Sequence, residues 1–328
     1  MGFLRVWLSL GVQNLVNVVS VTVARARRGP LRPGWSWRTE VMAGFMRRHF
    51  ARLQHRSWTD ARRTFEALAA FTPLGRGVER RHDTLAGRPA LWVTPRGVSP
   101  RRTMLFFHGG AYLFGTPKEY VDLVGRLACA GGLRAVSVDY RLAPEHPFPA
   151  ALDDALAAYR ALLAQGVAPE DVVVAGDSAG GGLTAALLVA LRGAGDPLPR
   201  AALLLGPWVD QAARGGSLVA HEPFDVFTPE MIVGWSEQVL AGADPKDPRA
   251  SPAWADLSGL PPLFIQVGGV EMLRDQVVAF AERAQAAGVD VTLREWADCF
   301  HDWQVYALVL PEGRAAIAEA GRWLAGLG

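Results

Sequence analysis

The stretch VVVAGDSAGGGLTAALLVAL, residues 172–191, decides the fold. It opens with an apolar run that suits a buried strand and closes with one that suits a helix. Between them, Gly176, Ser178 and Gly180 match the pattern G-x-S-x-G, in which a serine sits on a sharp strand-to-helix turn. Side chains at positions 176 and 180 would clash in that turn, and the helix N-terminus offers free N–H groups to developing negative charge. The stretch therefore predicts that Ser178 is a nucleophile at the end of a buried strand.

Short β-rich runs and helical runs alternate around this turn. Strands are predicted at Val78–His82, Ala90–Thr94, Thr103–Phe107, Arg134–Val138, Asp171–Ala175, Ala201–Leu205, Leu263–Val267 and Val291–Glu295. Helices are predicted at Glu119–Ala130, Ala150–Gln165, Gly180–Arg192, Leu273–Ala287 and Glu312–Leu327. The middle strands are apolar throughout, which is typical of parallel strands whose sheet is covered by helices on both faces. The sequence thus predicts an α/β fold with a mostly parallel, eight-stranded sheet flanked by helices.

Two segments interrupt this alternation. Residues 1–75 read as helical, and Ser57–Asp60 matches a capping box at the start of a helix. Almost sixty residues separate Leu205 from Leu263, which is far longer than an ordinary connection, and they include a helical run at Thr228–Leu240. We predict an inserted lid in this interval.

The run His108-Gly109-Gly110-Ala111 directly follows a predicted strand. Acyl transfer develops an oxyanion, and backbone N–H groups must already point at it. Because glycine lets the backbone approach a substrate closely, we assign donors to Gly109 and Gly110, together with the N–H of Ala179. His108 is interpreted as a structural residue that fixes this loop.

A serine nucleophile needs a neutral imidazole to take its proton. With this turn the base follows the nucleophile in the chain, and of the seven histidines only His221 and His301 do so. His221 lies in the predicted lid with no strand before it. His301 follows a predicted strand by the short loop 297–300, so it is the predicted general base.

The carboxylate that orients this histidine belongs in the loop after the predicted strand 263–267. Glu271 lies nearest the end of that strand, whereas Asp275 lies about one turn into the next helix. We predict Glu271 as the acid and keep Asp275 as the alternative. Asp298 and Asp302 flank His301 but are too close in sequence to orient its far nitrogen easily.

Charge is distributed unevenly along the 328 residues, although the formal net charge is only +2. Residues 1–63 hold twelve Arg and two acidic residues, a net of +10, which leaves the remainder near −8. Such asymmetry indicates a nucleic acid or an anionic membrane as a partner. No helix-turn-helix, zinc or RNA-binding signature accompanies it, so we predict no nucleic-acid partner. An anionic membrane and a merely solvated basic face both stay open.

Residues 3–24 form an apolar run with a stripe of polar residues at helical spacing. The stripe consists of Ser9, Gln13, Asn17 and Ser20. It weakens the run as a membrane span, which needs roughly 20 predominantly apolar residues. Arginines follow the run and oppose export, although residues 24–26 resemble a cleavage site. The pattern predicts an amphipathic helix that packs on the protein itself or lies in a membrane interface, with peripheral membrane contact through residues 1–35.

The two cysteines, Cys129 and Cys299, cannot build a disulfide framework and form no CxxC pair. A reducing compartment is the default for such a chain, which predicts a cytoplasmic location. Cys129 is predicted to be a buried helix residue, and Cys299 is predicted to have a packing role near His301.

Four runs resemble the hormone-sensitive-lipase-like family of carboxylesterases. They are HGGAY at 108–112, DYRLAPEHPFPAALDD at 139–154, GDSAGG at 176–181 and the Glu-x-Leu-x-Asp run at 271–275. The resemblance covers the chain from about residue 75 onward. It implies the α/β-hydrolase fold with a helical cap made from the N-terminal segment and an insertion after the sixth strand. The expected cap segments are 1–75 and 207–254, and the expected catalytic core is 76–206 with 255–328.

Two departures from the family matter. The family's common acid is Asp, whereas the matching position here is Glu271. Many members have Gly-Phe after the histidine, whereas Asp302-Trp303 follow His301 here. The runs FHDWQ at 300–304 and LPEGR at 310–314 look like the bacterial branch that includes monoterpene lactone hydrolases and acetyl-hydrolases.

Together these features predict a serine hydrolase that cleaves short- to medium-chain carboxylic esters through an acyl-enzyme, with Ser178, Glu271 and His301 as its triad. A lactone hydrolase or an amide deacetylase with the same triad is the alternative among enzymes. Outside the enzymes, a small-molecule-binding protein on this fold is the alternative, although the gibberellin receptor that resembles this family lacks the catalytic histidine.

The substrate pocket is predicted from residues near strand ends, where ligands bind in open α/β sheets. These residues are Tyr112, Leu113, Phe114, Asp177 and Trp208. No metal or organic cofactor is predicted, because there is no HExxH run, no Cys/His cluster and no GxGxxG in a dinucleotide-binding context. A small ester is the predicted partner. A homodimer stays open, because family members often pair through edge strands.

Overall fold

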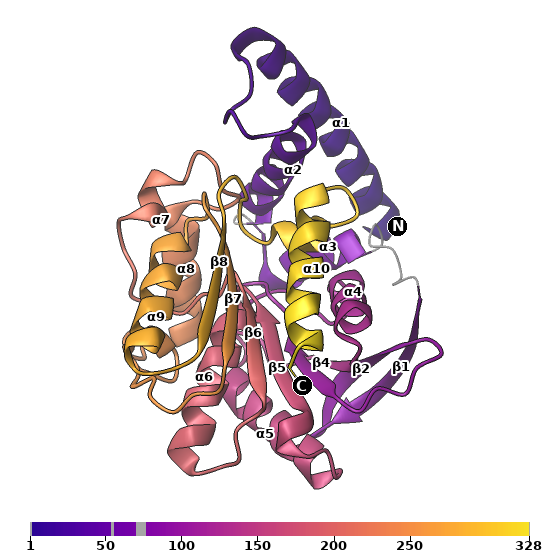
Figure 1. Ribbon diagram of the computed structural model, residues 1–328. Coiled ribbons are helices and arrows are strands. Elements are labelled where there is room, and N and C mark those ends of the chain that lie inside the picture. Colours follow the sequence, from indigo (N-terminus) through magenta and orange to yellow (C-terminus); the bar gives the residue numbers. More distant parts are fainter. Residues whose placement is uncertain (1, 54–55, 70–76, 328) are drawn as a thin grey trace.

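The computed structural model describes residues 2–53, 56–69 and 77–327 (Figure 1). Its centre is one eight-stranded sheet in the order β1-β2-β4-β3-β5-β6-β7-β8. The strands are β1 (Val78–Leu85), β2 (Arg88–Pro95), β3 (Thr103–Phe107), β4 (Arg134–Val138), β5 (Val172–Asp177), β6 (Ala201–Leu205), β7 (Leu263–Gly268) and β8 (Val291–Trp296). Strand β2 runs antiparallel to β1 and β4, and the other neighbouring pairs are parallel. The predicted eight-stranded, mostly parallel sheet is confirmed.

Helices cover both faces of the sheet. They are α4 (Val121–Gly131), α5 (Ala150–Ala164), α6 (Ala179–Ala194), α9 (Arg274–Ala286) and α10 (Pro311–Ala325). In β3, Met104 and Phe106 join the core beneath α4 and α10, whereas Leu105 and Phe107 join the core on the α5 and α6 side. All four side chains are 0% exposed, because successive residues of a strand point to opposite faces and both faces are covered. This arrangement explains why the strand is apolar throughout.

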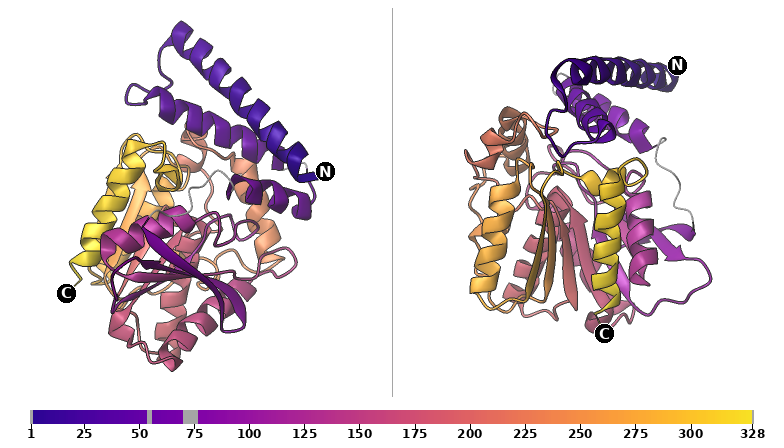
Figure 2. Two further views of the ribbon diagram at one scale, coloured as in Figure 1. Left: turned by 90° about the vertical axis from the view of Figure 1, so that its right-hand side faces the viewer. Right: turned by 45° about the horizontal axis from the view of Figure 1, so that its top comes forward.

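Five helices lie over one end of the sheet, and α1 is the outermost of them (Figures 1 and 2). They are α1 (Gly2–Arg28), α2 (Trp37–Leu53), α3 (Trp58–Ala69), α7 (Ser217–Ala220) and α8 (Pro229–Leu240). The N-terminal helices pack against the inserted segment through aromatic rings: Phe50 lies 4.7 Å from Phe227 and 5.9 Å from Trp235, centroid to centroid. These contacts join residues far apart in sequence into one helical layer.

Local details differ from the sequence predictions at a few points. The cap of α3 is as predicted, since the Asp60 N–H donates to Ser57 Oγ at 3.2 Å. Three short 3₁₀ helices went unpredicted, namely η1 (Pro169–Asp171), η2 (Pro252–Trp254) and η3 (Trp303–Tyr306). The prediction that Cys129 is buried is wrong, because it lies exposed in the last turn of α4. Within the described ranges, no helix has both the length and the apolar character needed to cross a membrane.

Candidate active site

Ser178 occupies the turn between β5 and α6 in a strained backbone conformation, with φ 54° and ψ −118°. Its N–H donates to the carbonyl of Leu205 at 2.8 Å, which anchors the turn to the neighbouring strand. A Cβ at Gly176 would overlap the backbone of Gly180, and a Cβ at Gly180 would overlap the carbonyl oxygen of Phe107. Both flanking glycines are therefore required by the tightness of the turn.

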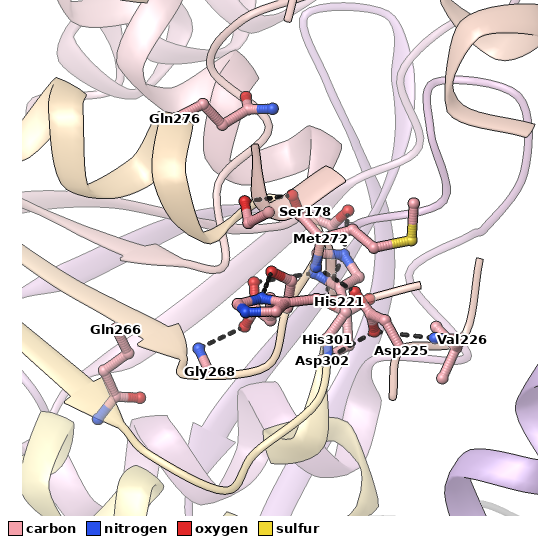
Figure 3. Close-up of polar contacts among 12 residues, drawn as sticks. Ser178, His221, Asp225, Val226, Gln266, Gly268, Met272, Gln276, His301 and Asp302 are labelled. Carbon is pink, nitrogen blue, oxygen red and sulfur yellow. Dashed lines mark hydrogen bonds and ion pairs between the residues drawn. The ribbon is translucent and has the colours of Figure 1, made fainter. Parts of the chain in front are cut away.

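Ser178, His301 and Glu271 form a continuous hydrogen-bonded chain (Figure 3). The Ser178 Oγ lies 2.7 Å from His301 Nε2, and His301 Nδ1 lies 3.2 Å from Glu271 Oε2. The other carboxylate oxygen of Glu271 accepts the N–H of Gly268 at 2.7 Å. His301 and Glu271 are fully buried, so water does not weaken their interaction. Three residues predicted separately from the sequence thus meet at one point.

Asp275, the alternative acid, and His221, the other histidine after Ser178, make contacts outside the Ser178–His301–Glu271 chain. Asp275 lies in the first turn of α9, accepts the N–H of Ser217 at 2.8 Å and pairs with Arg274 at 3.1 Å. It therefore fixes the start of α7. His221 Nδ1 donates to the backbone carbonyl of Glu271 at 2.9 Å, so it supports the loop that carries the acid.

Asp225 is a functional residue that the sequence reasoning missed. It comes from the inserted segment and is 1% exposed. Its Oδ1 accepts the N–H of Val226 at 2.9 Å and the N–H of His301 at 3.0 Å, and its Oδ2 accepts the N–H of Met272 at 2.6 Å (Figure 3). One buried carboxylate therefore holds both the acid loop and the histidine loop. No sequence motif surrounds Asp225, so its role in holding the two loops can be recognised only in the folded structure.

A second carboxylate approaches the histidine from the nucleophile's side. Asp302 Oδ1 lies 3.1 Å from His301 Nε2, and the Asp302 backbone is left-handed, with φ 61°. Asp177 is fully buried and interacts with Asp302. Burial raises the pKa of Asp177 well above its ordinary value, and the negative charge of Asp302 raises it further. Burial and the neighbouring charge thus favour the protonated, neutral form of Asp177.

These charges set the proton affinity of His301. Burial lowers the pKa of the imidazole, but the charge of Asp302 and the hydrogen bond to Glu271 outweigh burial and raise it. Burial raises the pKa of Glu271 to about 7, against the opposing effect of His301. We assign the shared proton of this pair to the imidazole, which lies between two carboxylates.

The backbone around Gly109, Gly110 and Ala179 borders Ser178. Among the described residues, none accepts a hydrogen bond from the N–H groups of these three. Gly110 has a φ of 110°, and a Cβ there would come within 2.5 Å of the Phe114 carbonyl oxygen. The loop therefore needs glycine at 110, and its two glycine N–H groups, like that of Ala179 in α6, have no acceptor among the described residues.

His108 supports this loop from below. Its ring stacks on Tyr140 at 4.3 Å between centroids, and its Nδ1 donates to the Gly109 carbonyl at 2.8 Å. Tyr140 Oη donates to the His108 carbonyl at 2.8 Å. Burial lowers the pKa of His108 to about 4, so the ring is neutral near pH 7. These contacts fit the structural role predicted for it.

A cavity of about 280 Å³ extends from Ser178 into the helical layer. Most of its wall is apolar or aromatic and is formed by Val41, Met42, Phe45, Met46, Phe50, Phe65, Phe114, Trp208, Phe227, Ile232 and Trp235. One side carries polar groups from Glu119, Tyr120, Asp122, Asp302 and Tyr306. Ser178 thus lies at the end of a largely apolar cavity with one acidic wall.

The five predicted pocket residues divide into two groups. Phe114 and Trp208 line the cavity. Tyr112, Leu113 and Asp177 are not among the residues that line it, and their part in the substrate pocket stays a prediction. The chain turns at Gly110, whose carbonyl accepts the N–H groups of Leu113 and Phe114, so adjacent side chains leave in different directions. Tyr112 lines a smaller cavity of about 30 Å³, Leu113 is buried in the core, and Asp177 faces Asp302.

The link between α1 and α2 reaches the histidine loop directly. Trp35 Nε1 donates to the carbonyl of Asp298 at 2.8 Å, and Arg32 Nε donates to Oδ1 of the same residue at 3.3 Å. The ring of Trp35 also packs edge-on against Phe300, 6.2 Å away. The link between α1 and α2 therefore contacts Asp298 and Phe300, two of the three residues that precede His301.

Comparisons with known proteins show which proteins this chain is similar to. A model of the alpha/beta hydrolase fold matches residues 104–305. An acetyl-hydrolase of Streptomyces hygroscopicus is 48% identical over 236 residues, covering 72% of this chain and 79% of that protein. A carboxylesterase of Mycobacterium tuberculosis is 36% identical over 234 residues, covering 68% and 72%. The crystal structure of an esterase from the bacterial hormone-sensitive lipase family is 41% identical with a TM-score of 0.86, covering 90% of this chain and 100% of that one.

Proposed function

Because the chain belongs to the α/β hydrolase family, as a carboxylesterase of its hormone-sensitive-lipase-like branch, we propose that Ser178, His301 and Glu271 carry out ester hydrolysis. The observation that carries this proposal is the chain of hydrogen bonds from Ser178 Oγ through the imidazole to the Glu271 carboxylate. Serine, imidazole and carboxylate in this order are the groups that acyl transfer needs.

Each residue then has a defined role in a two-step reaction. His301 Nε2 takes the proton of Ser178 as Oγ attacks the ester carbonyl. The N–H groups of Gly109, Gly110 and Ala179 hold the oxyanion, which their lack of other partners supports. The imidazolium gives its proton to the departing alkoxide, and water hydrolyses the acyl-enzyme by the same route. Glu271 keeps the imidazole oriented and stabilises its charged form.

Short- to medium-chain esters are the substrates that this cavity favours. Its volume of about 280 Å³ lies just below the roughly 300–1,000 Å³ of typical small-molecule sites. Its apolar wall suits an acyl chain, and its acidic wall suits a polar alcohol part. The similar acetyl-hydrolase of Streptomyces hygroscopicus supports a small acyl group, and the lactone hydrolase and amide deacetylase stay alternatives.

Hydrolysis of p-nitrophenyl esters from acetate to palmitate tests the proposal, with lactones and an N-acetyl amine measured in parallel. Ser178→Ala is expected to lower kcat by about 10⁴-fold or more, as loss of a triad nucleophile does. Ser258→Ala, at an exposed serine, is the control and should keep full activity. Esterase activity retained in Ser178→Ala would overturn the role of Ser178. If the protein opened lactones or cleaved the N-acetyl amine faster than it hydrolysed the esters, the lactone hydrolase or the amide deacetylase would replace the esterase as the proposed activity.

We also propose a cap and a location. Residues 1–75 and 207–254 act as the cap over the core formed by 76–206 and 255–328, a division supported by the aromatic contacts of Phe50 with Phe227 and Trp235. The two cysteines are free, which supports a reducing compartment such as the cytoplasm. Within it the protein associates peripherally with membranes, because α1 carries an exposed apolar face.

A further inference from the structure

Helix α1 packs on the rest of the protein through its polar side. Asn17 is 0% exposed, and its Nδ2 donates to the Val41 carbonyl of α2 at 2.7 Å. Arg48 of α2 donates through Nη1 to Asn17 Oδ1 and through Nη2 to Ser20 Oγ, the latter at 2.8 Å. These two members of the polar stripe therefore face inward.

The opposite side of α1 is apolar and faces outward. Leu15, Val16, Val19 and Val23 are 64%, 57%, 54% and 44% exposed, and we call these four residues the outer α1 face. They lie on consecutive turns of the outermost helix (Figure 2). Single exposed apolar residues are ordinary, but a contiguous apolar group on a surface helix marks an interaction site.

The surroundings of this face identify its partner. Trp37 is 42% exposed beside it, with Nε1 donating to Thr22 Oγ1 at 3.0 Å, and tryptophan is enriched where membranes meet water. Arg27 and Arg38 are exposed near the C-terminal end of α1. The first 63 residues carry a net charge of +10, of which Arg32, Arg47 and Arg62 pair with carboxylates of later segments. Anionic lipid head groups attract such a surface, whereas the same surface of a second copy would repel it.

The cavity that contains Ser178 extends to α1 from the interior of the protein. Gly11 and Asn14 of α1 line it, as do Met42 and Phe45 of α2, and it continues to Ser178. Leu308 also lines the cavity and is 54% exposed, so the cavity opens beside it. The route to the nucleophile therefore passes beneath the helix that bears the outer α1 face.

We propose that the outer α1 face docks on an anionic lipid bilayer and that α1 lies in the interface plane. In this position the cavity receives the ester of a membrane lipid or of a substrate dissolved in the bilayer. The substrate part of the inference rests on the proposed ester hydrolysis, whereas docking itself does not. The apolar face enters the head-group region, and the arginines at its end contact the anionic head groups.

Vesicle co-sedimentation of the full chain tests docking. The probes are vesicles of phosphatidylcholine alone and of phosphatidylcholine with phosphatidylglycerol, at low and high salt. The test variant is Val16→Glu/Val19→Glu. The matched control is Val98→Glu/Val219→Glu, which changes two valines with similar exposures of 54% and 56% outside α1. Thermal unfolding of each variant verifies that it is folded.

Wild type and control are expected to sediment with the anionic vesicles, more strongly at low salt, and the test variant is expected to bind at least about tenfold more weakly. All three should hydrolyse water-soluble p-nitrophenyl acetate equally, and absence of that activity from all three would count against ester hydrolysis and not against docking. Equal binding by both variants, or no binding by wild type, would overturn the inference. A dimer that Val16→Glu/Val19→Glu dissociates, without vesicle binding by wild type, would assign the face to a second copy instead.

Discussion

A carboxylate oxygen of Asp302 lies 3.1 Å from Nε2 of His301, and that nitrogen is also 2.7 Å from the hydroxyl of Ser178. The nitrogen can either donate its proton to a carboxylate or accept the proton of the serine. A protonated imidazole bound to Asp302 cannot act as a base. The contact therefore stabilises the resting, charged form of His301 at the expense of the reactive, neutral form.

The first prediction concerns pH. Since Asp302 and Glu271 raise the pKa of His301, the acidic limb of kcat/KM should lie above the ordinary histidine value of about 6.5. Replacing Asp302 by Asn removes one of these charges, so the limb should move down by about one pH unit. The control is Asp298→Asn, which removes a carboxylate that lies four residues earlier in the chain and pairs with Arg32. An unchanged limb in Asp302→Asn would show that this carboxylate does not act on the base.

The second prediction separates the two candidate acids. Glu271→Gln keeps the shape of the side chain but removes its charge from His301 Nδ1, so kcat should fall by about 10²- to 10⁴-fold. Asp275→Asn weakens the support of Ser217 and the pair with Arg274, neither of which touches His301, and should cost little activity. Steady-state kinetics on p-nitrophenyl butyrate decide between them, and a larger loss in Asp275→Asn would reverse the assignment.

The third prediction concerns Asp225, whose removal leaves three backbone N–H groups without their acceptor. Two of them belong to the loops that carry Glu271 and His301. Asp225→Ala should therefore lower the free energy of unfolding by about 3 kcal/mol and should also reduce kcat. Asp225→Asn keeps one oxygen acceptor, so its free energy of unfolding and its kcat should lie between those of Asp225→Ala and wild type. Thermal melts that match wild type for both variants would contradict this role.

The fourth prediction uses two glycines. A Cβ at Gly110 would meet the Phe114 carbonyl at 2.5 Å in a backbone region that favours glycine, so Gly110→Ala should displace the loop and cost about 10²-fold in kcat. Gly193 lies within α6 with open space around it, and Gly193→Ala should stabilise the helix by about 0.5–1 kcal/mol. Full activity of Gly110→Ala would remove the loop from the proposed oxyanion site.

Local patterns were enough to predict the sheet and to nominate Ser178, Glu271 and His301. Each lies in a loop that follows a strand, and the order of strands in the chain limits which loops meet. Asp225 could not be found this way, because its partners lie 47 and 76 residues away and backbone N–H groups leave no trace in a sequence. The interaction of Asp177 with Asp302 could not be predicted from the sequence for the same reason, since each residue belongs to a different motif.

The helix at the N-terminus shows a different limit. The spacing of Asn17 and Ser20 predicts a polar stripe, but spacing cannot tell which side of a helix meets the protein. Here Arg48 donates hydrogen bonds to Asn17 and Ser20 on the polar side of α1, so the apolar side of this helix faces outward. Tyr112 and Leu113 lie outside the cavity at Ser178, because a turn directs successive side chains away from one another and its geometry depends on hydrogen bonds that the Gly110 carbonyl accepts.

The bond from Trp35 to the Asp298 carbonyl has a consequence for protein engineering. Through this bond, the segment that contains α1 and α2 helps to position the loop before His301. It is therefore not a module that can be exchanged freely. A chimera that takes its N-terminal segment from a relative would bring a foreign side chain to the loop before His301. Successful recombination between relatives should therefore inherit the residues around 35 and 298 from the same parent, and crossover points that separate them should yield folded but poorly active hybrids.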